Sequence, residues 1–394
     1  ELIGTLNTEN YTFGDLDNAL NINTGGFNTN LSSYLKDNSD DNLIPKFVVN
    51  SKAFTEKGDT LFKLTSEILI NTKFDDVDRL KSVLTRQQSR VESSVKNNGI
   101  NYALTRLSSY YNKSGIFNEE TKGLSYYNFL TDLTENFDKK HQEISDKLTE
   151  TAKTLFTKKN MIAAVTCSDN QFETYTKDLQ ILTSSLPDGD GNYNTWNLNP
   201  TVKNEGLMAA SKIQYVTEGY NFKKLGYEWT GEMKVLNQIL STDYLQTQVR
   251  VIGGAYGGFC SFSPTGNTFF ASYRDPHLKL TLENFAKTPD FLDSLKVSDD
   301  EMTRYIIGTI SNMDSPTTPS QRGSIAVTRY FNNTKIDNLK KERSEVLATT
   351  IDDIKGMKKM VSDILSKDVI CVYGNNAKIK ENKDLFKSIA SVTK

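Results

Sequence analysis

Cysteine and net charge are scarce in this sequence, and long apolar runs are missing. The 394 residues include three scattered cysteines, Cys167, Cys260 and Cys371, which excludes a disulfide framework. Because each lies in an apolar, strand-like run, we expect buried free thiols and a reducing compartment. The formal net charge of −2 excludes a strong field that would attract nucleic acid or an anionic membrane. No apolar run approaches the roughly 18 residues of a membrane span, and 37% hydrophobic with 24% charged residues is typical of a soluble globular protein.

Histidine pairs and other catalytic motifs are also missing. The two histidines, His141 and His277, are far apart, whereas a zinc peptidase helix needs two imidazoles one turn apart beside a carboxylate, as in H-E-x-x-H or H-x-x-E-H. We therefore expect His141 to be a solvated surface residue. There is no phosphate-binding P-loop and no G-x-S-x-G elbow. Residues 188–192 (DGDGN) begin like a calcium loop, but Tyr193 stands where Gly is required and Asn199 where Glu should close the site. The sequence therefore offers no support for catalysis by this chain alone.

Alternating and helical patterns divide the first half of the chain into strands and helices. Residues 27–35 and 46–54 alternate on either side of a polar loop, which predicts an antiparallel pair. The apolar residues 160–167 (NMIAAVTC) predict a short buried strand. Helical periodicity predicts helices at residues 11–20, 61–69, 77–84, 104–111, 124–156 and 170–182.

A segment rich in Gly, Pro, Asn and Asp at residues 187–204 predicts a linker between a unit of residues 1–186 and a unit of residues 205–394. The second unit repeats the order of the first, with antiparallel strands, helices, a late strand and a last helix. Strands are predicted at 212–220, 254–273 (a hairpin) and 369–373, and helices at 231–249, 281–295, 298–313, 334–365 and 383–392. This order predicts an α+β fold of two homologous units, each an antiparallel sheet with helices packed on one face.

The most informative stretch covers residues 249–276 (VRVIGGAYGGFCSFSPTGNTFFASYRDP). Arg250 ends an amphipathic helix and is followed by paired glycines, Tyr256 and the hairpin. By themselves these residues suit a structural role, with Arg250 beside the negative end of the helix dipole and the glycines at bulges or a tight strand start. Composition alone favours this structural interpretation.

The same stretch resembles the last domain of the pitrilysin/insulinase-type zinc metallopeptidases. Its R-x5-Y, G-G-A-Y-G-G and S-Y-R-D-P motifs are most similar to the presequence-protease branch, which includes falcilysin. Residues 24–26 (TGG), after a short helix, resemble the third domain of that family. The chain as a whole therefore resembles domains three and four, the C-terminal half, and the resemblance implies two metallopeptidase-like domains from a clamshell that closes around unfolded peptides.

The resemblance also implies which residues act. Zinc and its H-x-x-E-H helix belong to the N-terminal half of such enzymes, so the complete enzyme would bind zinc and this chain would bind none. Arg250 and Tyr256 match the fourth-domain Arg and Tyr that reach across the chamber to donate hydrogen bonds to the substrate carbonyl and oxyanion. Close approach of the substrate backbone would be allowed by four glycines, Gly253, Gly254, Gly257 and Gly258.

We therefore expect the substrate-chamber half of a zinc metalloendopeptidase that degrades short unfolded peptides and is inactive without its N-terminal half. The alternative is a non-catalytic scaffold or regulatory subunit of the same family, which would not need Arg250 and Tyr256. For Arg274 we expect a structural pairing with Asp275 or a helix end.

The family pattern places one strand ahead of the point where this chain begins, which predicts a first sheet with an open edge. The expected partners are the N-terminal zinc-binding half and extended peptide substrates, with no nucleic acid and no membrane. No targeting segment is visible, and an intracellular location, in a bacterial cytoplasm or an organelle lumen, is favoured.

Overall fold

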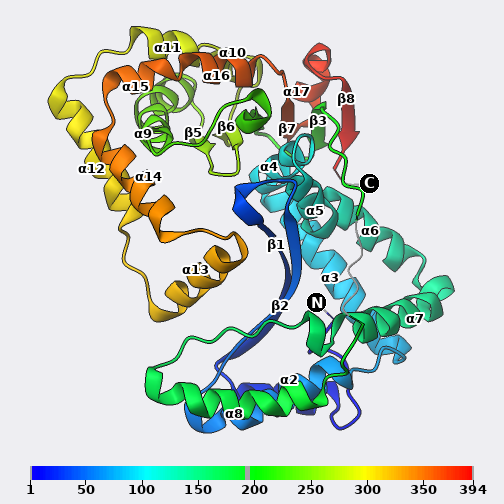
Figure 1. The fold of residues 1–394 in the computed structure, drawn as a ribbon. Coiled ribbons are helices and arrows are strands. Elements are labelled where there is room, and N and C mark those ends of the chain that lie inside the picture. The colour runs from blue at the N-terminus through cyan, green and yellow to red at the C-terminus, as the bar shows by residue number, and fades with distance from the viewer. Residues whose placement is uncertain (1, 191–195, 393–394) are drawn as a thin grey trace.

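The α+β class is confirmed by the computed structural model, which describes residues 2–190 and 196–392 (Figure 1). No helix among these residues combines the length and the apolar character that a membrane span requires. The first unit contains α1 (Phe13–Asn23), β1 (Gly26–Leu35), β2 (Leu43–Lys52), α2 (Gly58–Ile70), α3 (Val77–Asn97), α4 (Gly99–Ser109), α5 (Lys113–Lys122), α6 (Leu124–Glu135), α7 (Phe137–Leu155) and α8 (Asp169–Ser185).

The predicted antiparallel pair of the first unit is confirmed as the ribbon of β1 and β2, whose register runs from Gly26 opposite Lys52 to Leu35 opposite Leu43. Figure 1 shows this ribbon crossing the molecule from the larger sheet to helices α2 and α8. The predicted helix 124–156 is interrupted at Asn136, whose backbone leaves the helical range at φ −105° and ψ 11°. The break allows Phe137 to turn inward, where only 1% of it is exposed.

The predicted buried strand at residues 160–167 is wrong. The segment is extended, but no described strand pairs with it, and Ile162 is 51% exposed. Cys167 is therefore exposed, whereas Cys260 and Cys371 are buried as expected; all three are free thiols. An apolar composition suits a strand, but a strand also needs a neighbour for its backbone donors and acceptors.

The second unit is built on a six-stranded sheet of order β5-β6-β4-β7-β3-β8. The strands β3 and β7 run parallel, as do β3 and β8, and the other neighbours are antiparallel. The elements are β3 (Asn204–Ala209), β4 (Tyr215–Asn221), α9 (Glu232–Ile239), the π-helix η5 (Leu240–Ile252), β5 (Gly257–Phe262), β6 (Asn267–Tyr273), α10 (Lys279–Ala286), α11 (Thr288–Ser294), α12 (Asp299–Met313), α13 (Pro319–Phe331), α14 (Ile336–Ala348), α15 (Ile351–Gly356), α16 (Lys358–Leu365), β7 (Ile370–Asn375), α17 (Asn376–Glu381) and β8 (Ser388–Ser391).

Three predictions for the second unit need correction. The helix predicted at 383–392 is wrong, because residues 388–391 form β8 along the edge of β3. The helix predicted at 334–365 is divided into α14, α15 and α16, since the side chain of Thr350 accepts a hydrogen bond from the backbone N–H of Asp353 and begins a new helix there. The strand β3 and the helix α13 were not predicted.

Both faces of the six-stranded sheet are covered. Along β7, Ile370 and Val372 pack into a core with α9, η5 and α16, whereas the alternate residues Cys371 and Tyr373 pack into a second core. That second core is formed with helices of the first unit, chiefly α3, α4 and α6. The two units therefore share a hydrophobic core, and the sheet is a platform between them.

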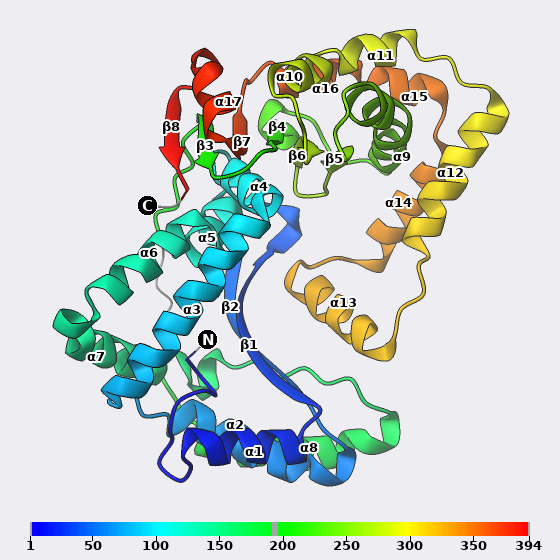
Figure 2. The ribbon, with the colours of Figure 1, turned by 180° about the vertical axis from the view of Figure 1, so that it is seen from behind.

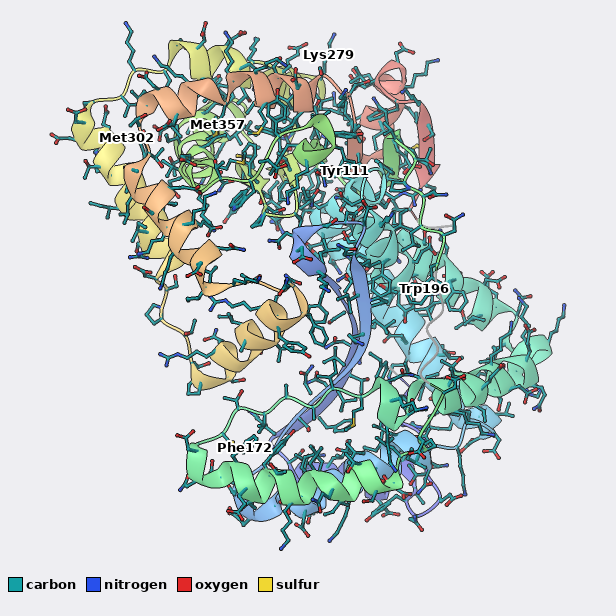
Figure 3. All side chains as sticks on the ribbon, in the orientation of Figure 1. Tyr111, Phe172, Trp196, Lys279, Met302 and Met357 are labelled. Carbon is teal, nitrogen blue, oxygen red and sulfur yellow. The ribbon has the colours of Figure 1, made fainter. Side chains whose placement is uncertain are left out.

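Tyr111 illustrates the shared core. It lies between α4 and α5, where the helices of the first unit meet the sheet (Figure 3), and it is 2% exposed. Its phenol oxygen donates to the backbone carbonyl of Thr268 at 3.3 Å, and its ring lies 5.5 Å from that of Tyr220. One aromatic side chain thus joins the helices of the first unit to two strands of the second.

The helix α13 returns from the second unit to the ribbon of the first (Figure 2). The rings of Phe331 and Tyr34 stack with centroids 4.5 Å apart, and the ammonium of Lys46 lies 5.8 Å from the Phe331 centroid. The side-chain oxygen of Asn332 accepts from the backbone N–H of Leu35 at 3.1 Å. We call these contacts the α13 clasp.

Candidate functional site

The helix that carries Arg250 is positioned by its buried face. The predicted apolar face is confirmed, because Met233, Leu236, Leu240 and Tyr244 are all buried. After Ile239 the helix continues as the π-helix η5, an uncommon form that often marks functional positions. Arg250 lies in its last turn and is exposed.

The turn after η5 needs glycine at particular positions. Gly254 has a left-handed φ of +75°, which glycine adopts without strain, and its N–H donates to the carbonyl of Arg250 at 2.9 Å. A Cβ on Gly253 would lie 2.7 Å from the carbonyl oxygen of Val249, and one on Gly258 would lie 2.8 Å from the Cβ of Val249. These two glycines are buried and are required for packing the turn and β5 on the helix.

Gly257 differs from the other three, because a Cβ there would meet nothing nearer than the Cβ of Tyr273 at 4.0 Å. Packing therefore does not explain this glycine. Close approach of a substrate backbone stays a prediction for all four glycines, and Gly254 and Gly257 are the two that are not buried.

Arg250 and Tyr256 are brought together by this turn. The guanidinium carbon of Arg250 lies 5.7 Å from the centroid of the Tyr256 ring, and Tyr256 is 66% exposed. The backbone N–H of Tyr256 donates to the carbonyl of Tyr273 at 3.0 Å, which fixes the start of β5 against β6. Within residues 2–190 and 196–392, no carboxylate forms an ion pair with Arg250. Both donors are thus free to bind an acceptor from outside the chain.

A row of tyrosine rings supports Tyr256 and was missed in the sequence. The Tyr256 ring meets that of Tyr273 edge-on at 5.9 Å, and Tyr273 lies 5.5 Å from Tyr215. Tyr215 in turn lies 6.1 Å from Tyr373. These residues come from different strands, so only the pairing of the sheet brings them together. The Y in S-Y-R-D-P was the one available signal.

Arg274 does not pair with Asp275, contrary to our prediction. The Asp275 side chain accepts from the backbone N–H of His277 at 2.8 Å and from the Thr281 hydroxyl at 2.7 Å. The Arg274 guanidinium lies instead over Tyr273, 5.6 Å from its ring centroid. Arg274 therefore belongs to the same surface as Tyr256.

The described residues do not fit a zinc ion. They contain no group of three or more His, Cys, Asp or Glu side chains that could hold a metal. His141 lies on α7 with its ring 6.2 Å from that of Phe137, and His277 lies in the loop after β6. The calcium-like residues 188–192 lie partly outside the described part of the chain, as do Tyr193 and other residues of the predicted linker 187–204.

Two recesses lie away from Arg250 and Tyr256. One of about 590 Å³ is lined by Thr24, Gly25 and Gly26 together with the first residues of the chain. Another of about 450 Å³ lies between β1 and α13, at the α13 clasp. Neither includes a residue that the sequence singled out as catalytic.

Comparisons with known proteins agree along the chain. The sequence pattern of a family described as associated with the C group of M16 peptidases matches residues 1–133, and that of the "PreP C-terminal domain" matches residues 204–373. Protein HypA of Clostridium perfringens is 36% identical over 394 residues, which are 100% of this chain and 40% of that protein. Presequence protease 1, chloroplastic/mitochondrial, of Arabidopsis thaliana is 30% identical over 367 residues, which are 92% of this chain and 34% of that protein. The chain thus spans no more than 40% of the length of these two relatives.

Solved structures share the fold. The peptidase M16 inactive domain from Pseudomonas fluorescens superposes with a TM-score of 0.57 at 13% identity, over 95% of this chain and 86% of that one. Pitrilysin superposes with a TM-score of 0.59 at 15% identity, over 91% of this chain and 36% of that one.

Proposed function

Because this chain belongs to the M16 metallopeptidases of the presequence-protease type, whose C-terminal region it carries, we propose that it forms the zinc-free half of a peptidase chamber. In this proposal the chain completes an active site whose metal is held by an N-terminal half. The whole protein would degrade short, unfolded peptides. The chain alone would be inactive, since its described residues offer no metal site.

The observation that supports this proposal is the exposed pair of Arg250 and Tyr256. A guanidinium and a phenol on neighbouring elements offer fixed donors to a peptide carbonyl, and such donors gain strength as negative charge develops on the carbonyl oxygen. Their positions come from a π-helix and a glycine turn rather than from a flexible loop. A rigid support of this kind is what a donor to a transition state needs.

We expect Arg250→Ala and Tyr256→Phe, introduced into the full-length zinc-loaded protein, each to lower kcat/KM for a peptide by about 10²–10³. Each variant removes one donor aimed at the reacting carbonyl. The melting temperature should stay unchanged, because both side chains are exposed and neither substitution empties a core. Peptide turnover and thermal unfolding, at equal zinc content, measure both quantities.

Arg304→Ala and Tyr330→Phe are matched controls, since both residues are exposed and lie on helices away from Arg250. They should keep wild-type turnover. Turnover within about threefold of wild type in the Arg250 and Tyr256 variants, far below the usual donor penalty, would contradict the proposal. It would favour the alternative of a non-catalytic scaffold or regulatory subunit.

The partners and the location belong to the same proposal. The N-terminal zinc-binding half and extended peptides are the proposed partners, and the printed name of the Arabidopsis relative, chloroplastic/mitochondrial, supports an intracellular site of action. Zinc analysis of this chain and of the whole protein, purified side by side, tests the proposed division: only the whole protein should hold the metal.

A further inference from the structure

Arg274 is held in a backbone conformation that arginine rarely adopts. Its φ is +50°, in the left-handed region that favours glycine and, less strongly, asparagine and aspartate. On one side it continues β6, and on the other Asp275 exchanges two backbone hydrogen bonds of 2.8 Å with Gln214. Glycine would fit here without strain, so the presence of a large side chain calls for a function of that side chain.

The side chain of Arg274 acts on tyrosine rings. Its guanidinium carbon lies 5.6 Å from the Tyr273 centroid, a distance typical of a cation–π contact. The phenol groups of Tyr273 and Tyr215 raise the pKa of the Arg274 guanidinium above its usual value, which shows that the cation and both phenols interact. No carboxylate among the described residues forms an ion pair with Arg274.

Tyr273 is the link from Arg274 to Tyr256. Its ring meets the Tyr256 ring edge-on at 5.9 Å and an interplanar angle of 65°. Apart from this contact and the Arg250 guanidinium at 5.7 Å, the 66% exposed Tyr256 ring has few restraints. The orientation of Tyr256 therefore depends on Tyr273, and that of Tyr273 depends on Arg274 and Tyr215.

We infer that Arg274 is a positioning residue that holds Tyr273 and, through it, aims the Tyr256 phenol at the substrate carbonyl. This inference rests on the proposed function of Tyr256. It assigns Arg274 an effect on the reaction without contact with the substrate. The two arginines would then restrain Tyr256 from both ends of one row, Arg250–Tyr256–Tyr273–Arg274.

The test is a double-mutant cycle in the full-length zinc-loaded protein. Arg274→Gly removes the guanidinium and relieves the left-handed backbone, so its melting temperature should match or exceed that of the wild type. We expect its kcat to fall roughly tenfold to a hundredfold, as for a misplaced catalytic group, with KM within about twofold. In a Tyr256→Phe background, Arg274→Gly should cause no further loss, because there is no phenol left to aim.

Arg274→Gln repeats the test without glycine, and His277→Ala, an exposed residue of the same loop, is the control with wild-type kcat expected. Equal losses with and without the Tyr256 phenol, an unchanged kcat in the Arg274 variants, or a similar loss in His277→Ala would each overturn the inference. If Tyr256→Phe loses turnover while the Arg274 variants do not, the inference fails and the proposed function stands. If Tyr256→Phe itself keeps turnover, both fail.

Discussion

Glu218 is a carboxyl group buried in the middle of the larger sheet. It lies on β4 and is 6% exposed. Burial, followed by the nearby charge of Asp368, raises the pKa of Glu218 to about 8. The group therefore keeps its proton in the folded protein at neutral pH, whereas it loses that proton when the chain unfolds.

This difference predicts the pH dependence of stability. Between the ordinary pKa of 4.5 and the folded pKa of about 8, the folded state binds more protons than the unfolded state, so the free energy of unfolding falls as pH rises. The fall is at most about 1.4 kcal/mol per pH unit. Because Glu218→Gln cannot titrate, its stability relative to wild type should grow through this window and level off above it.

Urea unfolding of both proteins from pH 5 to pH 9 measures this difference. The exposed Glu120→Gln is the control and should run parallel to wild type. Parallel curves for Glu218→Gln and wild type would show that Glu218 is ionised in the folded protein.

At the scale of elements, the α13 clasp is the contact whose loss should be local. Phe331→Ala removes the stack with Tyr34 and the cation–π contact with Lys46. An aromatic pair of this kind contributes about 0.5–1.5 kcal/mol beyond its buried area. We expect faster amide hydrogen exchange throughout α13 and at the end of β1, with little change in the global melting temperature. Ile325→Ala, an exposed position on the same helix, should leave exchange unchanged; uniform loss of protection across the chain would contradict a local clasp.

Elements with their own periodicity could be predicted from sequence, whereas elements defined by a neighbour could not. The ribbon of β1 and β2, the hairpin of β5 and β6 and the helix up to Arg250 follow local patterns. Residues 160–167 and 383–392 are short and ambiguous, so the presence or absence of an adjacent strand decides their structure. The former finds no strand beside it among the described residues, and the latter pairs with β3.

The candidate site divides in the same way. Arg250, Tyr256 and the glycines form one continuous motif, and the turn places the two donors together. The contribution of Tyr273 and Tyr215 depends on strands that meet only in the folded sheet. Their role could not be read from spacing along the chain.

At the scale of the whole molecule, a buried ionic cluster joins the two units. Arg106 on α4 donates to Glu205 on β3 at 2.8 Å and to Glu119 on α5 at 3.1 Å, and the Tyr110 phenol donates to Glu205 at 2.6 Å. Burial opposes ionisation of both carboxyl groups. For Glu205 the hydrogen bonds of Arg106 and Tyr110 prevail and lower the pKa, whereas the pKa of Glu119 stays raised.

Arg106→Met should therefore destabilise the chain by about 3–5 kcal/mol, because it leaves buried carboxyl groups without their cation. Denaturant unfolding measures the loss. In Arg106→Met/Glu205→Gln part of the stability should return, since one uncompensated charge is removed. Lys147→Ala, which breaks the exposed pair with Glu143, should have no measurable effect. An equally small effect of Arg106→Met would show that the cluster does not hold the units together.

The composition of residues 187–204 predicted the linker, but it could not show that the sheet of one unit is covered by helices of the other. Leu207 and Tyr373 pack against helices from before the linker. Such long-range burial has no local pattern. The division at 187–204 stays a prediction about the course of the chain, and the two units it separates do not have separate cores.

The position of β3 in the sheet has a consequence in time. It lies between β7 and β8, so residue 204 waits for residues 370 and 388 before either of its edges is paired. At about 5–20 residues per second on the ribosome, the 184 residues from 204 to 388 take roughly ten to forty seconds to synthesise. During that interval the strand that will be central presents two open edges in the growing chain. The most stable part of the sheet is thus the last to form, and the nascent protein depends on protection during this delay.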